Sequence, residues 1–260
     1  MLKNFSNALY ASILSSFYRT GSNHFDIVFK KGIFSLGILW STFKQLIIIS
    51  GISFVFSVGL KGSGLQIEYL FFNLLLWFLF AEITNTTISL PINTSLLSQN
   101  NSNAFTYILG HIFRIVIQYY LLLFLSFMIF FIFNLEVYHI DIIRGFIFMS
   151  FVSIIYAVLM SALLHAKTFL IEIHGFFMQA LFFASASVIP ISIIPNPIRD
   201  ILLINPIVHI QEYIKFNITG IQLEYISLSN AITFILFGIF FLLPALHYKN
   251  NKFNQELNVE

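Results

Sequence analysis

The sequence contains no cysteine and very few charged residues. The lack of cysteine excludes disulfides, thiol catalysis and cysteine-ligated metal clusters. Only 9% of the residues are charged, against about 25% in soluble proteins, whereas 58% are hydrophobic. The few Lys and Arg residues are scattered, so the sequence has neither a nucleic-acid footprint nor a polybasic lipid patch. We therefore expect the protein to work inside a bilayer and to bind no nucleic acid.

The sequence also lacks the common catalytic motifs. It has no GxxxxGK[ST] phosphate-binding loop, so the chain is not expected to hydrolyse ATP itself. HExxH and GxSxG are missing as well, and no carboxylate-rich spacing indicates a metal site. We therefore predict no enzymatic activity, no cofactor and no metal.

Long apolar stretches predict an all-α membrane protein with six spans. Each is long enough to cross about 30 Å of hydrocarbon at about 1.5 Å per residue. The spans cover about residues 33–58, 65–83, 105–133, 142–164, 173–194 and 226–246 within a membrane domain of residues 33–260. Residues 1–32 show apolar residues at helical spacing and predict an amphipathic interface helix. Residues 195–220 predict two short re-entrant helices.

The distribution of basic residues predicts the orientation, because Lys and Arg accumulate on the cytoplasmic side. With the N-terminus inside, seven basic residues outside the spans are cytoplasmic and four are external. The cytoplasmic set is Lys3, Arg19, Lys30, Lys31, Lys167, Lys249 and Lys252, and the external set is Lys61, Arg144, Arg199 and Lys215. Both termini are therefore expected in the cytoplasm.

Ionisable residues within spans are costly and are functional candidates by default. Lys44, Glu82 and Arg114 qualify, with Gln45 and Gln118 as polar neighbours. Lys44 lies near the start of its span, where its side chain can equally well extend to the interface. Glu82 and Arg114 fall toward the cytoplasmic ends of the second and third spans, which predicts an intramembrane ion pair between them.

Two further groups of residues have a functional and a plainer interpretation. His165 and His174 flank Lys167 and Glu172, but a solvated interfacial loop explains them better than a metal or proton site. Most of the 33 Phe are expected to face lipid. Some aromatic residues can instead line a passage for sugar rings, whose C–H faces stack on aromatic planes. The candidates are Tyr107, Tyr119, Tyr120, Tyr156 and Trp77.

Several segments together resemble the membrane subunits of ABC-2 type exporters, in particular the capsular-polysaccharide export permeases of the KpsM type. Residues 36–40 (LGILW) resemble the family's entry into its first span, and residues 167–172 resemble its turn between spans four and five. The strongest likeness runs from Val188 to Gly220 and includes Asn205-Pro206-Ile207-Val208-His209. The likeness extends over essentially the whole chain.

This resemblance implies a half-transporter of the bacterial inner membrane. Two copies would form the path for a lipid-linked polysaccharide, and a separate nucleotide-binding ATPase would drive it, with periplasmic and outer-membrane export partners beyond. The residues that the resemblance assigns to contact with the ATPase are Leu96, Leu97, Ser98, Lys167, Thr168 and Glu172. Those that it assigns to a periplasmic gate are Pro195, Asn205, Pro206, His209 and Glu212.

The sequence departs from the family at two positions. Family members commonly carry an acidic residue followed by proline after the first-span Trp, where this chain has Lys44-Gln45, and the loop at 95–103 lacks the family's basic residues. Export permeases for O-antigen or teichoic acid share the architecture and remain alternatives for the cargo. A different class, an ion-coupled carrier or intramembrane enzyme, would use Glu82, Arg114, His165 and His174.

Overall fold

The computed structural model describes residues 36–59, 67–89, 104–133, 139–164, 168–185, 187–189, 191–220 and 227–257, and these form a helical bundle. The long helices are α2 (Leu36–Gly59), α3 (Ile67–Ser89), α5 (Ala104–Ile132), α6 (His139–Leu163) and α10 (Leu228–Leu257). The shorter elements are α7 (Thr168–Ala184), the 3-10 turn η1 (Ile191–Ile193), α8 (Asn196–Leu202) and α9 (Pro206–Thr219). No strand occurs among these residues, which confirms the predicted all-α class for the described part of the chain.

Four helices are long and apolar enough to cross a membrane. Their apolar stretches are Trp40–Gly59, Ile67–Ile88, Ile108–Ile132 and Ile140–Leu163. They correspond to the first four predicted spans, although α3 continues six residues beyond the predicted end at residue 83. The predicted interface helix at 1–32 lies outside the described residues.

The fifth predicted span, at 173–194, is wrong in its limits. The helix begins at Thr168, so Thr168 and Glu172 are helical rather than part of a turn, and it ends at Ala184 after 17 residues. Its length is roughly 25 Å at 1.5 Å per residue. Ser185 ends it by donating a hydrogen bond back to the carbonyl of Phe182 at 2.9 Å, and the prolines that follow disfavour further helix.

The sixth predicted span, at 226–246, is only part of a longer helix. The apolar portion of α10 runs from Leu228 to Leu242, while the helix itself continues through Pro244 to Leu257. Both α7 and the apolar portion of α10 are shorter than a typical spanning helix. Six crossings therefore stay a prediction, whereas four candidate spans are established.

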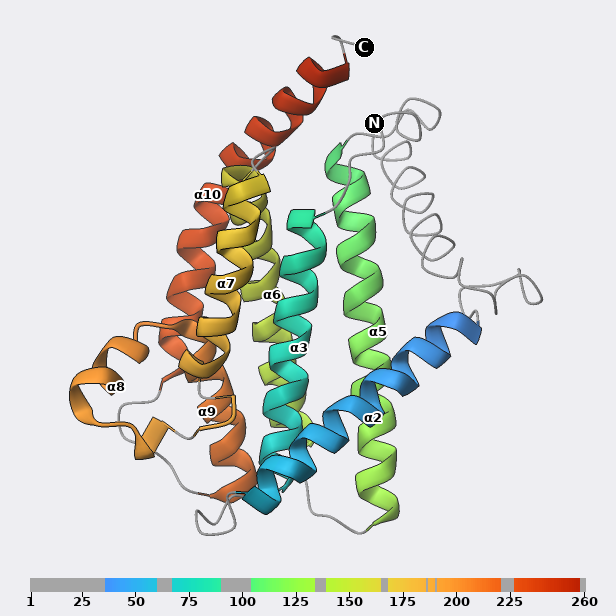
Figure 1. Ribbon diagram of the computed structural model, residues 1–260, viewed down its shortest axis with the longest axis vertical. Helices are drawn as coiled ribbons and strands as arrows, with labels where there is room; N and C mark the ends of the chain where they lie inside the picture. The colour runs from blue at the N-terminus through green and yellow to red at the C-terminus, as the bar shows by residue number, and fades with distance from the viewer. Residues whose placement is uncertain are drawn as a thin grey trace.

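Helix α3 lies at the centre of the bundle, and α2 lies at its edge. In the apolar stretch of α3, 72% of the residues are buried, compared with 22% for α2. Helix α3 packs against α2, α5, α6, α7 and α9, and α10 packs on the other side of α6. Figure 1 shows α2 crossing obliquely in front of α3 and α5.

Successive long helices run in opposite directions. In Figure 1, α3 and α6 end at the upper end of the bundle, where α5 and α7 begin and toward which α10 runs. Helices α8 and α9 lie near the lower end, where α7 ends and α10 begins. The alternation therefore places the beginning of α7 at the opposite end of the molecule from the α8–α9 pair.

Candidate functional site

Helices α8 and α9 both lie within residues 195–220, where the sequence predicted two short helices. Pro195 is the N-cap of α8, and its carbonyl accepts from the backbone of Arg199 at 2.9 Å. The side chain of Asn205 caps α9 by accepting from the Ile207 amide at 3.0 Å, and Pro206 occupies the first turn. Gly220 ends α9 with a left-handed φ of 70°, a conformation that glycine adopts without strain.

Helix α9 is short but deeply buried. Eight of its 14 residues are buried, among them the polar residues His209, Gln211, Glu212 and Lys215. It packs against α3, α6 and α10. A helix surrounded in this way is held by protein on several sides, which is the setting in which interrupted helices are tolerated at membrane depth.

Glu212 forms a buried ion pair within α9 and a hydrogen bond to the segment before α8. Its Oε2 lies 3.2 Å from Nζ of Lys215, and the two side chains are only 2% and 8% exposed. Its Oε1 accepts from the backbone amide of Ile191 at 3.1 Å. Lys215 Nζ also lies 5.5 Å from the centre of the Tyr69 ring on α3, within the range of a cation–π contact.

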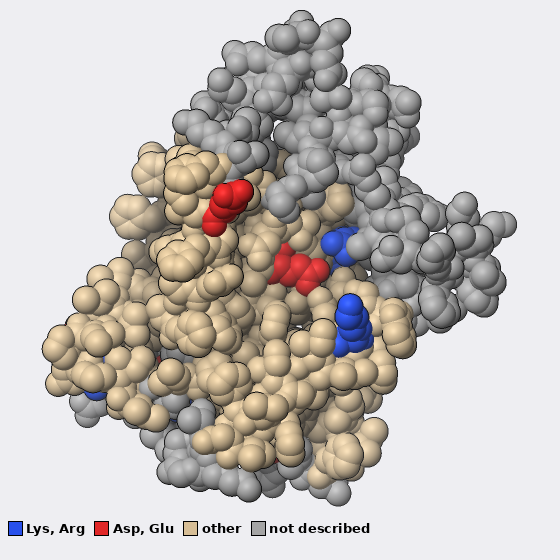
Figure 2. Space-filling view, viewed as in Figure 1, with Lys and Arg blue, Asp and Glu red and all other residues tan. Residues whose placement is uncertain are grey.

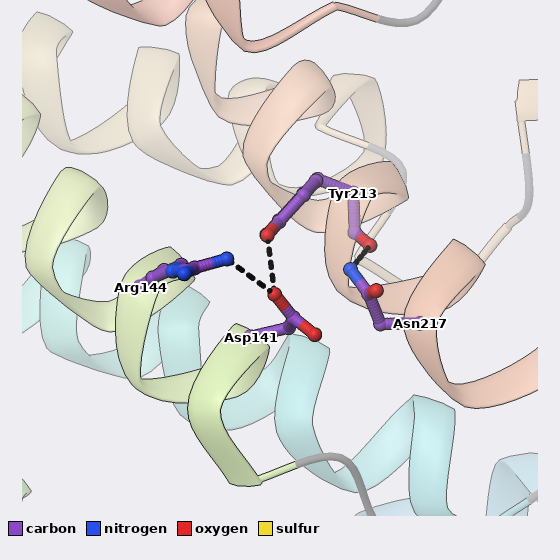
Figure 3. A network of polar contacts seen from close by, with 4 residues as sticks. All are labelled: Asp141, Arg144, Tyr213 and Asn217. Carbon is purple, nitrogen blue, oxygen red and sulfur yellow. Dashed lines mark hydrogen bonds and ion pairs between the residues drawn. The ribbon is translucent and has the colours of Figure 1, made fainter.

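A second polar contact joins α9 to the beginning of α6 (Figure 3). The Tyr213 hydroxyl donates to Oδ1 of Asp141 at 2.8 Å, and Arg144 donates to the same oxygen at 3.1 Å. Asn217 donates to the carbonyl of Tyr213 at 2.8 Å. Burial, together with the bond to the Asp141 carboxylate, raises the pKa of Tyr213. The hydroxyl therefore stays protonated and remains a donor at neutral pH.

An open cavity of about 850 Å³ lies between α2, α3 and α7. Its walls are mainly apolar and include several aromatic residues, and the polar residues Asn85, His174 and Gln179 also line it. The aromatic lining residues are Phe56, Trp77, Phe78, Phe182 and Phe183. Of the aromatic residues proposed from the sequence, Trp77 is at the cavity, and Tyr156 lies behind it with its hydroxyl 3.4 Å from Nε2 of the buried His174.

Glu82 and Arg114 are linked by a chain of hydrogen bonds. Gln45 donates to Oε2 of Glu82 at 2.6 Å, Gln118 donates to Oε1 of Gln45 at 3.0 Å, and Arg114 lies 3.4 Å from Oε1 of Gln118. Tyr119 also donates to Glu82, at 2.9 Å. Among the described residues, no salt bridge joins Glu82 directly to Arg114. The predicted pair is thus replaced by a relay through two glutamines.

This relay connects three helices at one level of the bundle. Gln45 belongs to α2, Glu82 to α3, and Arg114, Gln118 and Tyr119 to α5; Gln118 additionally donates to Ser41 of α2 at 2.7 Å. In Figure 2, acidic and basic side chains lie close together near the centre of a face on which few of the other described residues are charged. Because α2 has few buried residues, these polar bonds are a large part of what holds it.

Replacing Gln118 by leucine should loosen α2, because one substitution removes the link between Arg114, Gln45 and Ser41. We expect the free energy of unfolding to fall by about 1–2 kcal/mol, measured by thermal unfolding in detergent. Gln179→Leu is the matched control, since Gln179 is exposed on α7 and should change stability little. Equal effects of the two substitutions would contradict the role of the relay.

Only part of the expected ATPase contact can be located. Leu96, Leu97, Ser98 and Lys167, like His165, lie outside the described residues. Thr168 is the first residue of α7, and Glu172 is exposed one turn further on. Both therefore belong to the end of the bundle opposite α8 and α9 (Figure 1).

Four residues that contribute to these sites were not predicted as partners of the candidate residues. Lys215 was counted only for orientation, although its i, i+3 spacing from Glu212 on one helix indicated a pair. Asn230, whose Nδ2 lies 2.7 Å from Nε2 of His209, is 21 residues away and gave no signal. The relay role of Gln45 and Gln118 depends on which helix faces meet, which sequence spacing does not fix.

The chain matches no protein-family model, and no curated protein sequence matches it either. Among the described residues, no group of three or more His, Asp or Glu side chains is arranged to hold a metal ion.

Proposed function

We propose that this chain is the membrane-spanning permease subunit of an ATP-driven ABC exporter in the bacterial inner membrane. Its cargo would be a lipid-linked polysaccharide of the capsular type, and a separate nucleotide-binding subunit would supply the energy. The proposal begins from the resemblance of residues 36–40, 167–172 and 188–220 to that class of permease. The single structural observation that carries it is the aromatic cavity between α2, α3 and α7.

The composition of the cavity suits a sugar polymer that carries a lipid. Aromatic rings stack on the apolar faces of sugars, and the scattered polar groups at Asn85, His174 and Gln179 offer hydrogen bonds without binding a charge tightly. A polymer has to slide, and such contacts are individually weak. The apolar remainder of the wall is equally compatible with the chain of a lipid anchor.

The cavity is open beside two helices that expose many of their residues. Helix α2 is mostly exposed, and α7 has exposed aromatic residues such as Phe169, Phe176 and Phe177. A second copy placed against this side would complete a closed path, which is why we propose a homodimer. Because successive helices alternate in direction, the ATPase contact at the beginning of α7 would lie at the opposite end of the molecule from α8 and α9. Helices α8 and α9 would then close the external mouth of the path.

The test uses two glycines that have open space where a side chain would begin. A Cβ atom added at Gly175 or at Gly51 has no neighbour within 4 Å, but only Gly175 lines the cavity. We expect Gly175→Trp to abolish export of polysaccharide to the cell surface, while the complex with the ATPase and its nucleotide hydrolysis persist. Gly51→Trp should export normally.

Two outcomes would overturn this proposal. One is export by the Gly175→Trp protein at the level of the Gly51→Trp protein, which would show that the cavity is not the path. The other is transport of polymer by the purified chain in vesicles without any ATPase subunit, which would contradict the need for an external motor.

A further inference from the structure

His209 connects three segments that are separate in the sequence. Its ring is 1% exposed on α9. Nε2 lies 2.7 Å from the carbonyl of Leu203, at the corner between α8 and α9, and 2.7 Å from Nδ2 of Asn230 on α10. Nδ1 lies 3.3 Å from the backbone nitrogen of Ser227, directly before α10. One imidazole therefore holds the corner against the beginning of α10.

The partners of His209 determine where its proton lies. A backbone N–H only donates, so Nδ1 must accept from Ser227 and carries no hydrogen. A backbone carbonyl only accepts, so Nε2 must carry the hydrogen that bonds to Leu203. The amide of Asn230 then presents its oxygen to the same N–H, since the nitrogen and oxygen of a side-chain amide are assigned from such networks. All these contacts fit the neutral ring.

Protonation would break this arrangement. A second hydrogen on Nδ1 would point at the Ser227 N–H, and two donors would then face each other in a site that water does not reach. We propose that His209 is a pH-sensitive clasp that fastens the α8–α9 corner to α10 when the ring is neutral and releases it when the ring is protonated. The contact is therefore present at higher pH and lost on acidification.

The other titratable groups around the clasp lie on the helices that pack against α9 and at the α8–α9 corner. Glu212, one turn along α9, is paired with Lys215. Helix α10 has no titratable residue from Leu228 to Leu246. The remaining titratable residues on the elements packed around α9 and at the corner are Glu68, Tyr69 and Glu82 of α3, His139, Asp141, Arg144 and Tyr156 of α6, Tyr213 of α9, Arg199 and Asp200 of α8, and, beyond Leu246, His247, Tyr248, Lys249, Lys252 and Glu256 of α10.

The clasp can be tested without any cargo, because the sequence has no cysteine and tolerates specific labelling. Spin labels at Ile204→Cys, in the corner, and at Ile232→Cys, on α10, occupy exposed positions. In the full-length protein in nanodiscs, we expect one short distance population at about pH 8. Most of it should be replaced by longer distances on acidification to about pH 5.

Three variants separate the clasp from a general effect of acid. His209→Gln keeps a side-chain N–H but does not titrate, so its distance distribution should not change with pH. Ser227→Pro removes the N–H that bonds to Nδ1, together with the hydroxyl that accepts from the Ser229 amide at 3.1 Å, and should show the longer distances already at about pH 8. His174→Gln, at a second buried histidine among the described residues, should keep the wild-type response.

The inference fails if the labelled wild type shows no pH dependence. It fails equally if His209→Gln retains the response, or if Ser227→Pro behaves as wild type at every pH. Because the readout is a distance within the chain, these outcomes are independent of whether the protein exports polysaccharide.

Discussion

Replacing Lys215 by methionine is expected to lower the free energy of unfolding by about 3–5 kcal/mol, the cost of leaving one buried charge without its partner. Glu212 is 2% exposed and Lys215 is 8% exposed, with 3.2 Å between Oε2 and Nζ. Methionine fills a similar volume, so the effect reports the lost charge rather than a cavity. Unfolding in mixed detergent micelles, followed by circular dichroism, measures it.

The double variant Lys215→Met, Glu212→Gln distinguishes charge from packing. A neutral glutamine can still accept from the Ile191 amide through Oε1, so the double variant should recover most of the loss. Arg144→Met is the matched control, because the Arg144–Asp141 pair is exposed and water screens it; the arginine is 61% exposed. A Lys215→Met protein as stable as the Arg144→Met protein would refute the argument.

The shape of the α8–α9 region was largely predictable from local chemistry. Asn205-Pro206 combines a capping side chain with a residue suited to the first helical turn, and Gly220 supplies the left-handed residue that ends α9. These signals act within a few residues and do not depend on the rest of the fold. What they could not indicate is that α9 would be buried on several sides, since that depends on α3, α6 and α10.

The limits of α7 show where hydropathy alone fails. Residues 173–194 are apolar almost throughout, so they read as one span. The helix nevertheless ends at Ala184, where Ser185 bonds back to Phe182 and to Ser187. The hydroxyl of Ser185 makes these bonds, which hydropathy does not register, and Ile191 further along packs against Val208 instead.

The polar relay illustrates a different limit. Glu82 and Arg114 were recognisable because an ionisable side chain in a span needs a partner. A direct ion pair between Glu82 and Arg114 was the simplest arrangement that the sequence suggested. The oblique crossing of α2 brings Gln45 between them and aligns it with Gln118. Helix crossing angles depend on the whole packed surface, so the intermediary residues could be noted as polar companions but not placed.

Replacing Gly238 by leucine is expected to destabilise the bundle by about 3 kcal/mol, near the upper end of the usual cost of overpacking. A Cβ at this buried position of α10 would overlap Cγ2 of Ile155 on α6 and lie 3.3 Å from its Cβ. Ile155 is β-branched and 2% exposed, so its side chain has little freedom to move away. Helices α6 and α10 would therefore have to separate.

Two further variants serve as controls for Gly238→Leu. Gly51→Leu introduces an equal volume on α2 where no atom lies within 4 Å of the new Cβ, and it should leave the unfolding midpoint nearly unchanged. Adding Ile155→Ala to Gly238→Leu should restore part of the lost stability, because it removes the overlapping methyl group. If Gly238→Leu unfolds at the same denaturant concentration as Gly51→Leu, then close approach at this glycine does not set the α6–α10 contact. Small residues normally allow two membrane helices to approach closely. In that case, residues other than Gly238 in the α6–α10 interface must set the distance between the two helices.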